Sequence, residues 1–244
     1  MKIVAIIQAR CGSSRFPNKI FADISGKPLI WHVVNRLKYS ETIDEILIAT
    51  TTNCLDDKLA EWADNNNIKI FRGNENNVLN RYYEASKYIN ADVIIRITAD
   101  DPFKEPMLID KAVNKLINDG ADFVSNNNPP SYPEGLDVEV FTSKAIEIAE
   151  QNSISSFERE HVTQYFYKNS SCFKIYNISN DINLSYLRWT IDTDIDLCMV
   201  DQVYKKLYIS DDKIFYMNDI LALLKECPEI EKVNNSVSRS EMYK

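Results

Sequence analysis

The chain has 244 residues, of which 45% are hydrophobic and 26% charged. This composition excludes a disordered chain, a collagen-like repeat and a small disulfide scaffold. The net charge of -8 argues against bulk nucleic acid or an anionic membrane as a partner, although a few local cations can still hold a small anionic ligand.

The five cysteines are scattered, form no CxxC pair and are odd in number, which favours a reduced, cytoplasmic chain. The apolar run at residues 3–7 is far shorter than the roughly 18 residues of a membrane span, and no later run reaches that length. We therefore expect a cytoplasmic protein with a single domain over residues 1–244 and a polar, mobile tail over about residues 233–244.

Predicted strands and helices alternate along the chain. The first half is predicted to contain strand 2–8, helix 29–39, strand 45–51, helix 56–67, strand 68–71, helix 76–89, strand 92–98 and helix 106–119. The second half is predicted to contain strand 122–125, a proline-rich loop at 126–135, strand 136–141, helices 143–151 and 155–168, strands 173–178 and 186–189, and helices 194–207 and 218–226.

Strands separated by helices of this length predict an α/β fold with a mainly parallel sheet. Ligands bind such sheets beyond the carboxyl ends of the strands. The residues that directly follow each buried strand are therefore the first place to look for chemistry.

The loop after the first strand, QARCGSSRFPNK at residues 8–19, concentrates positive charge and hydrogen-bond donors. It carries Arg10, Gly12, Ser13, Ser14, Arg15 and Lys19. Arginine forks and backbone N–H groups suit a triphosphate, whereas the alternative is a solvated basic loop. The loop matches neither the GxxxxGK[ST] pattern nor GxGxxG.

Aspartates follow two further predicted strands. Asp100 and Asp101 come after Thr98, where the strand at 92–98 ends, and Asp192 follows the short apolar run at 186–189. Carboxylates in such places can hold a divalent cation, but they can equally cap the helices that come next. Asp194 is better placed as a helix cap, which makes Asp192 the better metal candidate.

Three more polar residues are candidates for binding a substrate. Asp137 and Glu139 alternate along the strand at 136–141 and therefore point to the same face. They can be the solvated side of an edge strand, or they can bind sugar hydroxyls. His161 lies in a predicted helix, where a lone histidine is more often structural than functional.

Several motifs together resemble one family. The segment IIQARCGSSRFPNKIFADISGKPLIWHVVNRL resembles the opening of the bacterial cytidylyltransferases that make CMP-activated acidic sugars, which include the 3-deoxy-manno-octulosonate and acylneuraminate enzymes. ITADDPF, PEGLDVEVF, REHVTQYFY and RWTIDTDIDL follow in the family's order, over residues 3–205, and look most like the spore coat polysaccharide biosynthesis protein F branch. The resemblance implies a Rossmann-like nucleotide-diphosphosugar transferase fold with a mixed, mainly parallel central sheet flanked by helices, and it implies a homodimer.

The resemblance also implies an activity and a set of roles. The activity is transfer of CMP from CTP to an acidic sugar or related acceptor, with Mg²⁺ as cofactor and pyrophosphate as product, for surface polysaccharide biosynthesis. The expected catalytic residues are Arg15, Lys19, Asp100 and Asp192, of which Asp100 and Asp192 fall on the family's metal-binding acids. The expected nucleotide-binding residues are Gln8, Ala9, Arg10, Gly12, Ser13, Ser14 and Thr98, and the expected substrate-binding residues are Asp137, Glu139 and His161.

The chain departs from the family's pattern in ways that leave the acceptor open. Thr98, Ala99 and Asp101 stand where the octulosonate enzymes have Gln, Gly and Glu, and Ser14 is followed by Arg15 where the acylneuraminate signature has a lysine. Another nucleoside triphosphate with a sugar phosphate, or a non-catalytic nucleotide- or sugar-binding module on the same fold, are the alternatives. The aromatic stretch at 162–176 can supply a dimer interface, although such a stretch is more often core.

Overall fold

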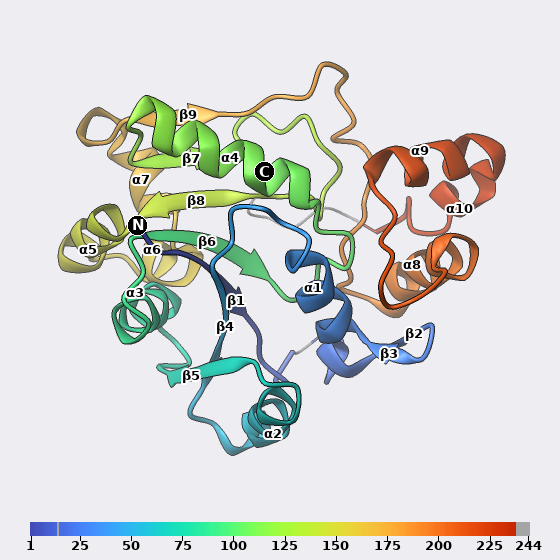
Figure 1. Cartoon of the computed structure of the whole chain (residues 1–244), viewed down its shortest axis with the longest axis horizontal. Coiled ribbons are helices and arrows are strands. Elements are labelled where there is room, and N and C mark those ends of the chain that lie inside the picture. The colour runs from blue at the N-terminus through green and yellow to red at the C-terminus, as the bar shows by residue number, and fades with distance from the viewer. Residues whose placement is uncertain (14, 238–244) are drawn as a thin grey trace.

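In the computed structural model, which describes residues 1–13 and 15–237, strands from the first half of the chain form the parallel part of a central sheet (Figure 1). β1 (Ile3–Gln8) lies between β4 (Glu45–Thr51) and β6 (Val93–Thr98), and β5 (Lys69–Gly73) pairs with β4. All of these pairings are parallel. The cores of β1, β4 and β6 are buried on both faces of the sheet, as their continuous apolar runs predict.

Beyond β6 the sheet contains a strand that runs in the opposite direction. β8 (Glu139–Thr142) pairs antiparallel with β6 and with β7 (Phe123–Ser125), and β9 (Ile175–Asn177) pairs parallel with β7. Over the described residues the sheet has the order β5-β4-β1-β6-β8-β7-β9. The expected Rossmann-like architecture with a mixed, mainly parallel sheet is confirmed. Its register places Glu139 opposite Arg96, near the end of β6.

Helices cover both faces of the sheet, because successive side chains of a strand point to opposite faces. α1 (Leu29–Leu37) and α4 (Pro106–Asp119) contribute to the core on one face, and α3 (Val78–Tyr88) and α5 (Ser143–Asn152) to the core on the other. α8 (Asp194–Leu207), α9 (Met217–Glu226) and α10 (Pro228–Lys232) gather at the side of the sheet toward which β6 points (Figure 1). This third group leaves the carboxyl ends of the strands facing the start of α8.

Smaller elements complete the path of the chain. A hairpin of β2 (Asp23–Ile24) and β3 (Lys27–Pro28) precedes α1, and α2 (Asp57–Asn65) follows β4. Short 3-10 turns occur at η1 (Lys19–Phe21), η2 (Cys54–Asp56) and η3 (Ser170–Cys172). Of the helices in residues 1–13 and 15–237, none is both long and apolar enough to cross a membrane.

The helix expected at residues 155–168 is in fact two helices. α6 (Ser156–His161) and α7 (Gln164–Lys168) are separated at Val162, which has φ 52° and ψ -66°. The Thr163 N–H donates to the His161 carbonyl over 2.5 Å, which closes a γ-turn. Positive φ is unfavourable for a branched side chain, so helical periodicity gives no sign of this break. Phe166 and Phe173 are buried, so this aromatic stretch belongs to the core.

The second half of the chain differs from expectation in four further places. No strand forms at residues 186–189, where Arg188 makes a single bridge to Glu134. The strand expected at 136–141 begins only at Glu139, and α10 was not foreseen. Asn234, which falls in the expected mobile tail, is only 2% exposed because its side chain is hydrogen-bonded inside the protein. Residues 238–244 lie outside the described part of the chain.

Candidate active site

The cationic loop that follows β1 is held by a buried aspartate from the next βα unit. Oδ1 of Asp56 accepts the Cys11 N–H over 2.7 Å, and its other oxygen accepts the Thr51 hydroxyl. Burial alone would raise the pKa of Asp56, but these donors lower it, so the carboxylate stays charged. Asp56 therefore fixes the backbone of the loop at Cys11. Ser14 lies outside the described residues.

Lys19 joins two aspartates that are far apart in the sequence. Its Nζ atom donates to Oδ2 of Asp100 over 2.9 Å and to Oδ1 of Asp192 over 3.0 Å, and it also donates to the Ile191 carbonyl over 3.0 Å. Arg15 reaches the same Oδ1 of Asp192, with its Nη2 atom 3.0 Å away. The structure thus brings together all four residues that the sequence singled out as catalytic.

The charges at this point stabilise one another. Burial disfavours the ionised form of both Lys19 and Asp100, but their attraction outweighs it. The pKa of Lys19 is therefore raised and the pKa of Asp100 lowered. The site carries a full ammonium and a full carboxylate near neutral pH.

The neighbouring Asp101 has a different environment. Its side chain is 5% exposed, pairs with Lys104 over 2.7 Å, and accepts the Thr98 hydroxyl over 2.6 Å. Burial and the charge of Asp100 raise the pKa of Asp101. Lys104 also donates to the Asp137 carbonyl over 2.6 Å. Asp101 and Lys104 therefore form an internal pair that supports the wall of the site.

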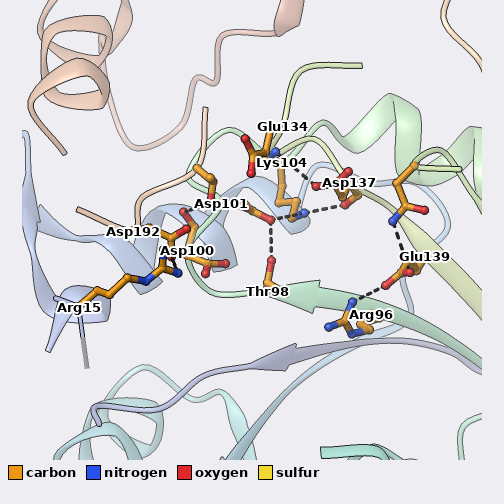
Figure 2. A pocket seen from close by; sticks show the side chains of 13 residues that line it. Arg15, Arg96, Thr98, Asp100, Asp101, Lys104, Glu134, Asp137, Glu139 and Asp192 are labelled. Atoms are coloured by element: carbon orange, nitrogen blue, oxygen red, sulfur yellow. Dashed lines mark hydrogen bonds and ion pairs between the residues drawn. The ribbon is translucent and has the colours of Figure 1, made fainter. Parts of the chain in front are cut away.

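A second group of polar residues lies across the site from Asp192, and Figure 2 shows both groups. Glu139 forms an ion pair with Arg96 and accepts the Thr163 hydroxyl over 2.7 Å. Asp137 lies between this pair and Asp101 (Figure 2). The γ-turn at Val162 thus has a clear local result, because it brings Thr163 onto Glu139.

Two adjoining pockets open at these carboxyl ends, and they share Arg15, Thr98, Asp100 and Asp192. One is otherwise lined by Gln8, Ala9, Arg10, Ser13, Lys19, Ile20 and Ala99. The other is otherwise lined by Arg96, Asp101, Lys104, Asn127, Glu134, Gly135, Asp137, Glu139 and Thr190. We call the pocket that contains Gln8 and Lys19 the cationic pocket, and the pocket that contains Asp137 and Glu139 the carboxylate-rich pocket. The shared residues form the border between them.

Two expected site residues lie outside these linings. Gly12 is in the loop but lines neither pocket. His161 packs on Phe157, with ring centroids 4.5 Å apart, and lines neither pocket. Burial lowers the pKa of His161, which keeps the ring neutral near pH 7. The structure therefore gives His161 a packing environment.

Several residues of the pockets were not foreseen from the sequence. They are Arg96, Lys104 and Asn127, and no role was predicted for Glu134, Gly135 and Thr190 although they belong to the quoted motifs PEGLDVEVF and RWTIDTDIDL. Arg188 was also missed, and its Nη2 atom lies 3.1 Å from Oδ2 of Asp192. Arg188 opens the quoted motif RWTIDTDIDL, which was its signal in the sequence.

A loop of cations facing two aspartates at the carboxyl edge of an α/β sheet suits the phosphates of a nucleotide, which indicates the class of nucleotide-binding proteins. Comparison with known proteins narrows this class. A family model described as "Cytidylyltransferase" matches residues 4–207. The chain therefore belongs to the cytidylyltransferase family.

Individual relatives agree with the family. An uncharacterized protein of Methanocaldococcus jannaschii is 37% identical, over 100% of this chain and 98% of that protein. The spore coat polysaccharide biosynthesis protein SpsF of Bacillus subtilis is 29% identical, over 84% of this chain and 87% of that protein. A solved cytidylyltransferase from Leptospira borgpetersenii is 32% identical with a TM-score of 0.89, and the match covers 95% of this chain and 97% of that one.

Proposed function

We propose that this protein transfers CMP from CTP to a hydroxyl group of an acidic sugar or related acceptor, releases pyrophosphate, and serves surface polysaccharide biosynthesis. The observation that carries the proposal is the bridge from Lys19 to Asp100 and Asp192 at the border of the two pockets. The polysaccharide role is supported by the similarity to SpsF. The acidic acceptor is supported by the motifs that resemble the enzymes for CMP-activated acidic sugars.

The cationic pocket is the proposed nucleotide site. Arg15 and Lys19 bind the β- and γ-phosphates that leave as pyrophosphate, and Arg10 reaches the α- or β-phosphate. Gln8 and Ala9 approach the base. Oε1 of Gln8 is buried and has no hydrogen-bond partner among the described residues, so it is an acceptor suited to the amino group of cytosine. Gly12, Ser13, Ser14 and Thr98 complete this proposed site.

Asp100 and Asp192 are the proposed ligands of Mg²⁺. Each places a carboxylate oxygen within 3.0 Å of one cationic nitrogen, so two oxygen ligands already converge on a positive charge. No cluster of three His, Cys, Asp or Glu suited to a metal occurs in residues 1–13 and 15–237. Mg²⁺ in nucleotide sites typically needs only one or two carboxylates, with phosphates and water as the other ligands. When bound there, the cation offsets the charge of the phosphates.

The carboxylate-rich pocket is the proposed acceptor site. Asp137 and Glu139 accept hydrogen bonds from acceptor hydroxyls, while Arg96 and Thr163 hold Glu139 in place. The acceptor oxygen attacks the α-phosphorus in line, the bond from that phosphorus to the oxygen that bridges the α- and β-phosphates breaks, pyrophosphate leaves with that oxygen, and the hydroxyl proton passes to solvent. Most of the rate enhancement then comes from positioning and charge stabilisation. Cytoplasmic location and a homodimer are part of the same proposal, and light scattering tests the dimer.

Nucleotide selectivity tests the donor. With Mg²⁺ present, CTP should raise the melting temperature of the protein far more than UTP, ATP or GTP does. A ligand at 100 times its Kd increases the free energy of unfolding by about 2.7 kcal/mol. Pyrophosphate release with CTP and a panel of acidic sugars then identifies the acceptor. Equal shifts with all four nucleotides would contradict the choice of CTP. Stabilisation by CTP without release for any acceptor would favour a binding module.

A further inference from the structure

Arg188 is buried next to the proposed metal ligand Asp192 and contacts three carboxylates. Its side chain is 6% exposed. Nη1 lies 3.0 Å from Oε1 of Glu134, Nη2 lies 3.1 Å from Oδ2 of Asp192, and Nε lies 2.8 Å from Oδ1 of Asp196. These ion pairs raise the pKa of Arg188 despite its burial, so the guanidinium is a permanent charge.

The first turn of α8 fixes Arg188 from the other side. Asp196 is fully buried, and its Oδ2 accepts from the N–H groups of Asp192 and Thr193, each over 3.0 Å. The Thr193 hydroxyl caps the helix by accepting the Asp196 N–H. Asn234 contributes from beyond α10, with its amide 3.0 Å from Oδ1 of Asp196 and 3.0 Å from the Arg188 carbonyl. The backbone that carries Asp192 and the guanidinium that holds it are therefore parts of one cluster.

The two oxygens of Asp192 have very different partners. Oδ2 lies 3.1 Å from Nη2 of the buried Arg188, and the same Nη2 donates to Oδ2 of Asp196 over 3.0 Å, so the guanidinium is held in place by several carboxylates. Oδ1 contacts Lys19 and Arg15, and the Arg15 side chain is 58% exposed. Of the two partners of Oδ1, Arg15 is an exposed loop cation that phosphates can attract away, and Lys19 is shared with Asp100, whereas the partner of Oδ2 is buried and fixed.

We propose that Arg188 is a positioning residue that occupies Oδ2 of Asp192 permanently, so that Asp192 offers the divalent cation only Oδ1. This inference rests on the proposed function. The partner of a metal ligand fixes the direction in which the ligand points, and losing such a partner typically weakens metal binding about 10–100-fold. If Arg188 were only structural, it would link α8 to the loop that carries Glu134, and its loss would not change the affinity for the metal.

The test measures how much Mg²⁺ strengthens CTP binding. The ratio of the CTP Kd in EDTA to the CTP Kd in saturating Mg²⁺, from calorimetric titration, reports this coupling without any turnover. Arg188→Lys keeps the charge but loses the fork that holds several carboxylates. We expect it to lower the ratio about tenfold and to leave the Kd in EDTA within about twofold.

Asn234→Ala is the matched control, because Asn234 supports Asp196 but does not contact Asp192. It should lower the melting temperature and leave the ratio unchanged. If Arg188→Lys is too unstable, the double variant Arg188→Gln with Asp196→Asn removes one charge of each sign and should also lose the coupling. A wild-type ratio of one would contradict the proposed metal site itself. A wild-type coupling retained in Arg188→Lys, or in the double variant where Arg188→Lys does not fold, would overturn this inference alone.

Discussion

Lys19 and Asp192 are 173 positions apart in the sequence, yet Nζ of Lys19 donates to Oδ1 of Asp192 over 3.0 Å. The contact joins the 3-10 turn after the cationic loop to the residues just before α8. It brings together the first and the last of the sequence motifs quoted for the family.

Replacing Lys19 with alanine should weaken CTP binding by about tenfold or more, because a charge-assisted hydrogen bond typically contributes about 1.5–3 kcal/mol. Isothermal titration with CTP and Mg²⁺ measures the effect. Lys27→Ala is the control. Lys27 lies in β3, forms an ion pair with Asp211 and lines neither pocket. Equal CTP affinity in Lys19→Ala and wild type would count against the phosphate-loop assignment.

Replacing Asp100 with asparagine keeps the shape of the side chain but removes its charge. Turnover should fall by at least about 10², the scale seen when a main electrostatic group is lost. Pyrophosphate release with CTP and the acceptor identified by the panel is the measurement. Asp92→Asn, at the other end of β6 with a side chain 59% exposed, should keep its activity. An Asp100→Asn protein with wild-type turnover would refute the role of Asp100.

Gly135→Ala should distort the wall of the carboxylate-rich pocket. Gly135 has φ +102°, and a Cβ there would lie 2.8 Å from the Trp189 carbonyl carbon, which is backbone and cannot swing away. We expect a loss of more than about 2 kcal/mol in the free energy of unfolding, measured with urea. Gly26→Ala is a matched control, because Gly26 also has positive φ but opens onto free space, and it should lose only about 1 kcal/mol. Equal losses would show that the clash is not the cause.

His32 should make stability depend on pH. Burial lowers the pKa of His32 to about 4, and Arg36 adds to this effect, although Nε2 lies 2.8 Å from the Ile24 carbonyl. The unfolded chain therefore binds the proton at a higher pH than the folded protein does. The free energy of unfolding should fall as the pH drops from 6.5 to 4, by up to roughly 3 kcal/mol from this residue.

The difference between wild type and His32→Gln isolates this contribution, because His161 and the carboxylates titrate in both proteins. Urea unfolding at several pH values measures it. The two curves should converge toward pH 4 and separate toward pH 7. Parallel curves over that range would mean that His32 titrates normally in the folded protein.

The sequence predicts the fold best where one local signal is strong. β4 and α4 have the predicted bounds, because a continuous β-branched run and a helix closed by Gly120 leave little choice. Val162 is the opposite case, since a buried valine with positive φ exists only because tertiary packing imposes it. The sequence predicts Asn234 to be part of a polar tail. Its burial is explained only by its hydrogen bond to Asp196 in the folded protein.

Sequence patterns likewise identify some residues of the candidate site and miss others. Lys19, Asp100 and Asp192 were identified because each follows the end of a predicted strand or belongs to a quoted motif. No role was predicted for Arg96, or for Arg188 although it opens the quoted motif RWTIDTDIDL, since the role of a buried arginine is set by the carboxylates that surround it in space. Residue patterns thus indicate part of the pocket lining, whereas the buried partners in the ion pairs require coordinates.

The two pockets are made by different stretches of chain. Residues 8–20 supply most of the cationic lining, while residues 127–139 supply most of the opposite wall. Under the proposed assignment of the two pockets, changes in the second stretch would alter which molecule receives the nucleotide and leave the donor side untouched. Remodelling one connection would then be enough for a new acceptor.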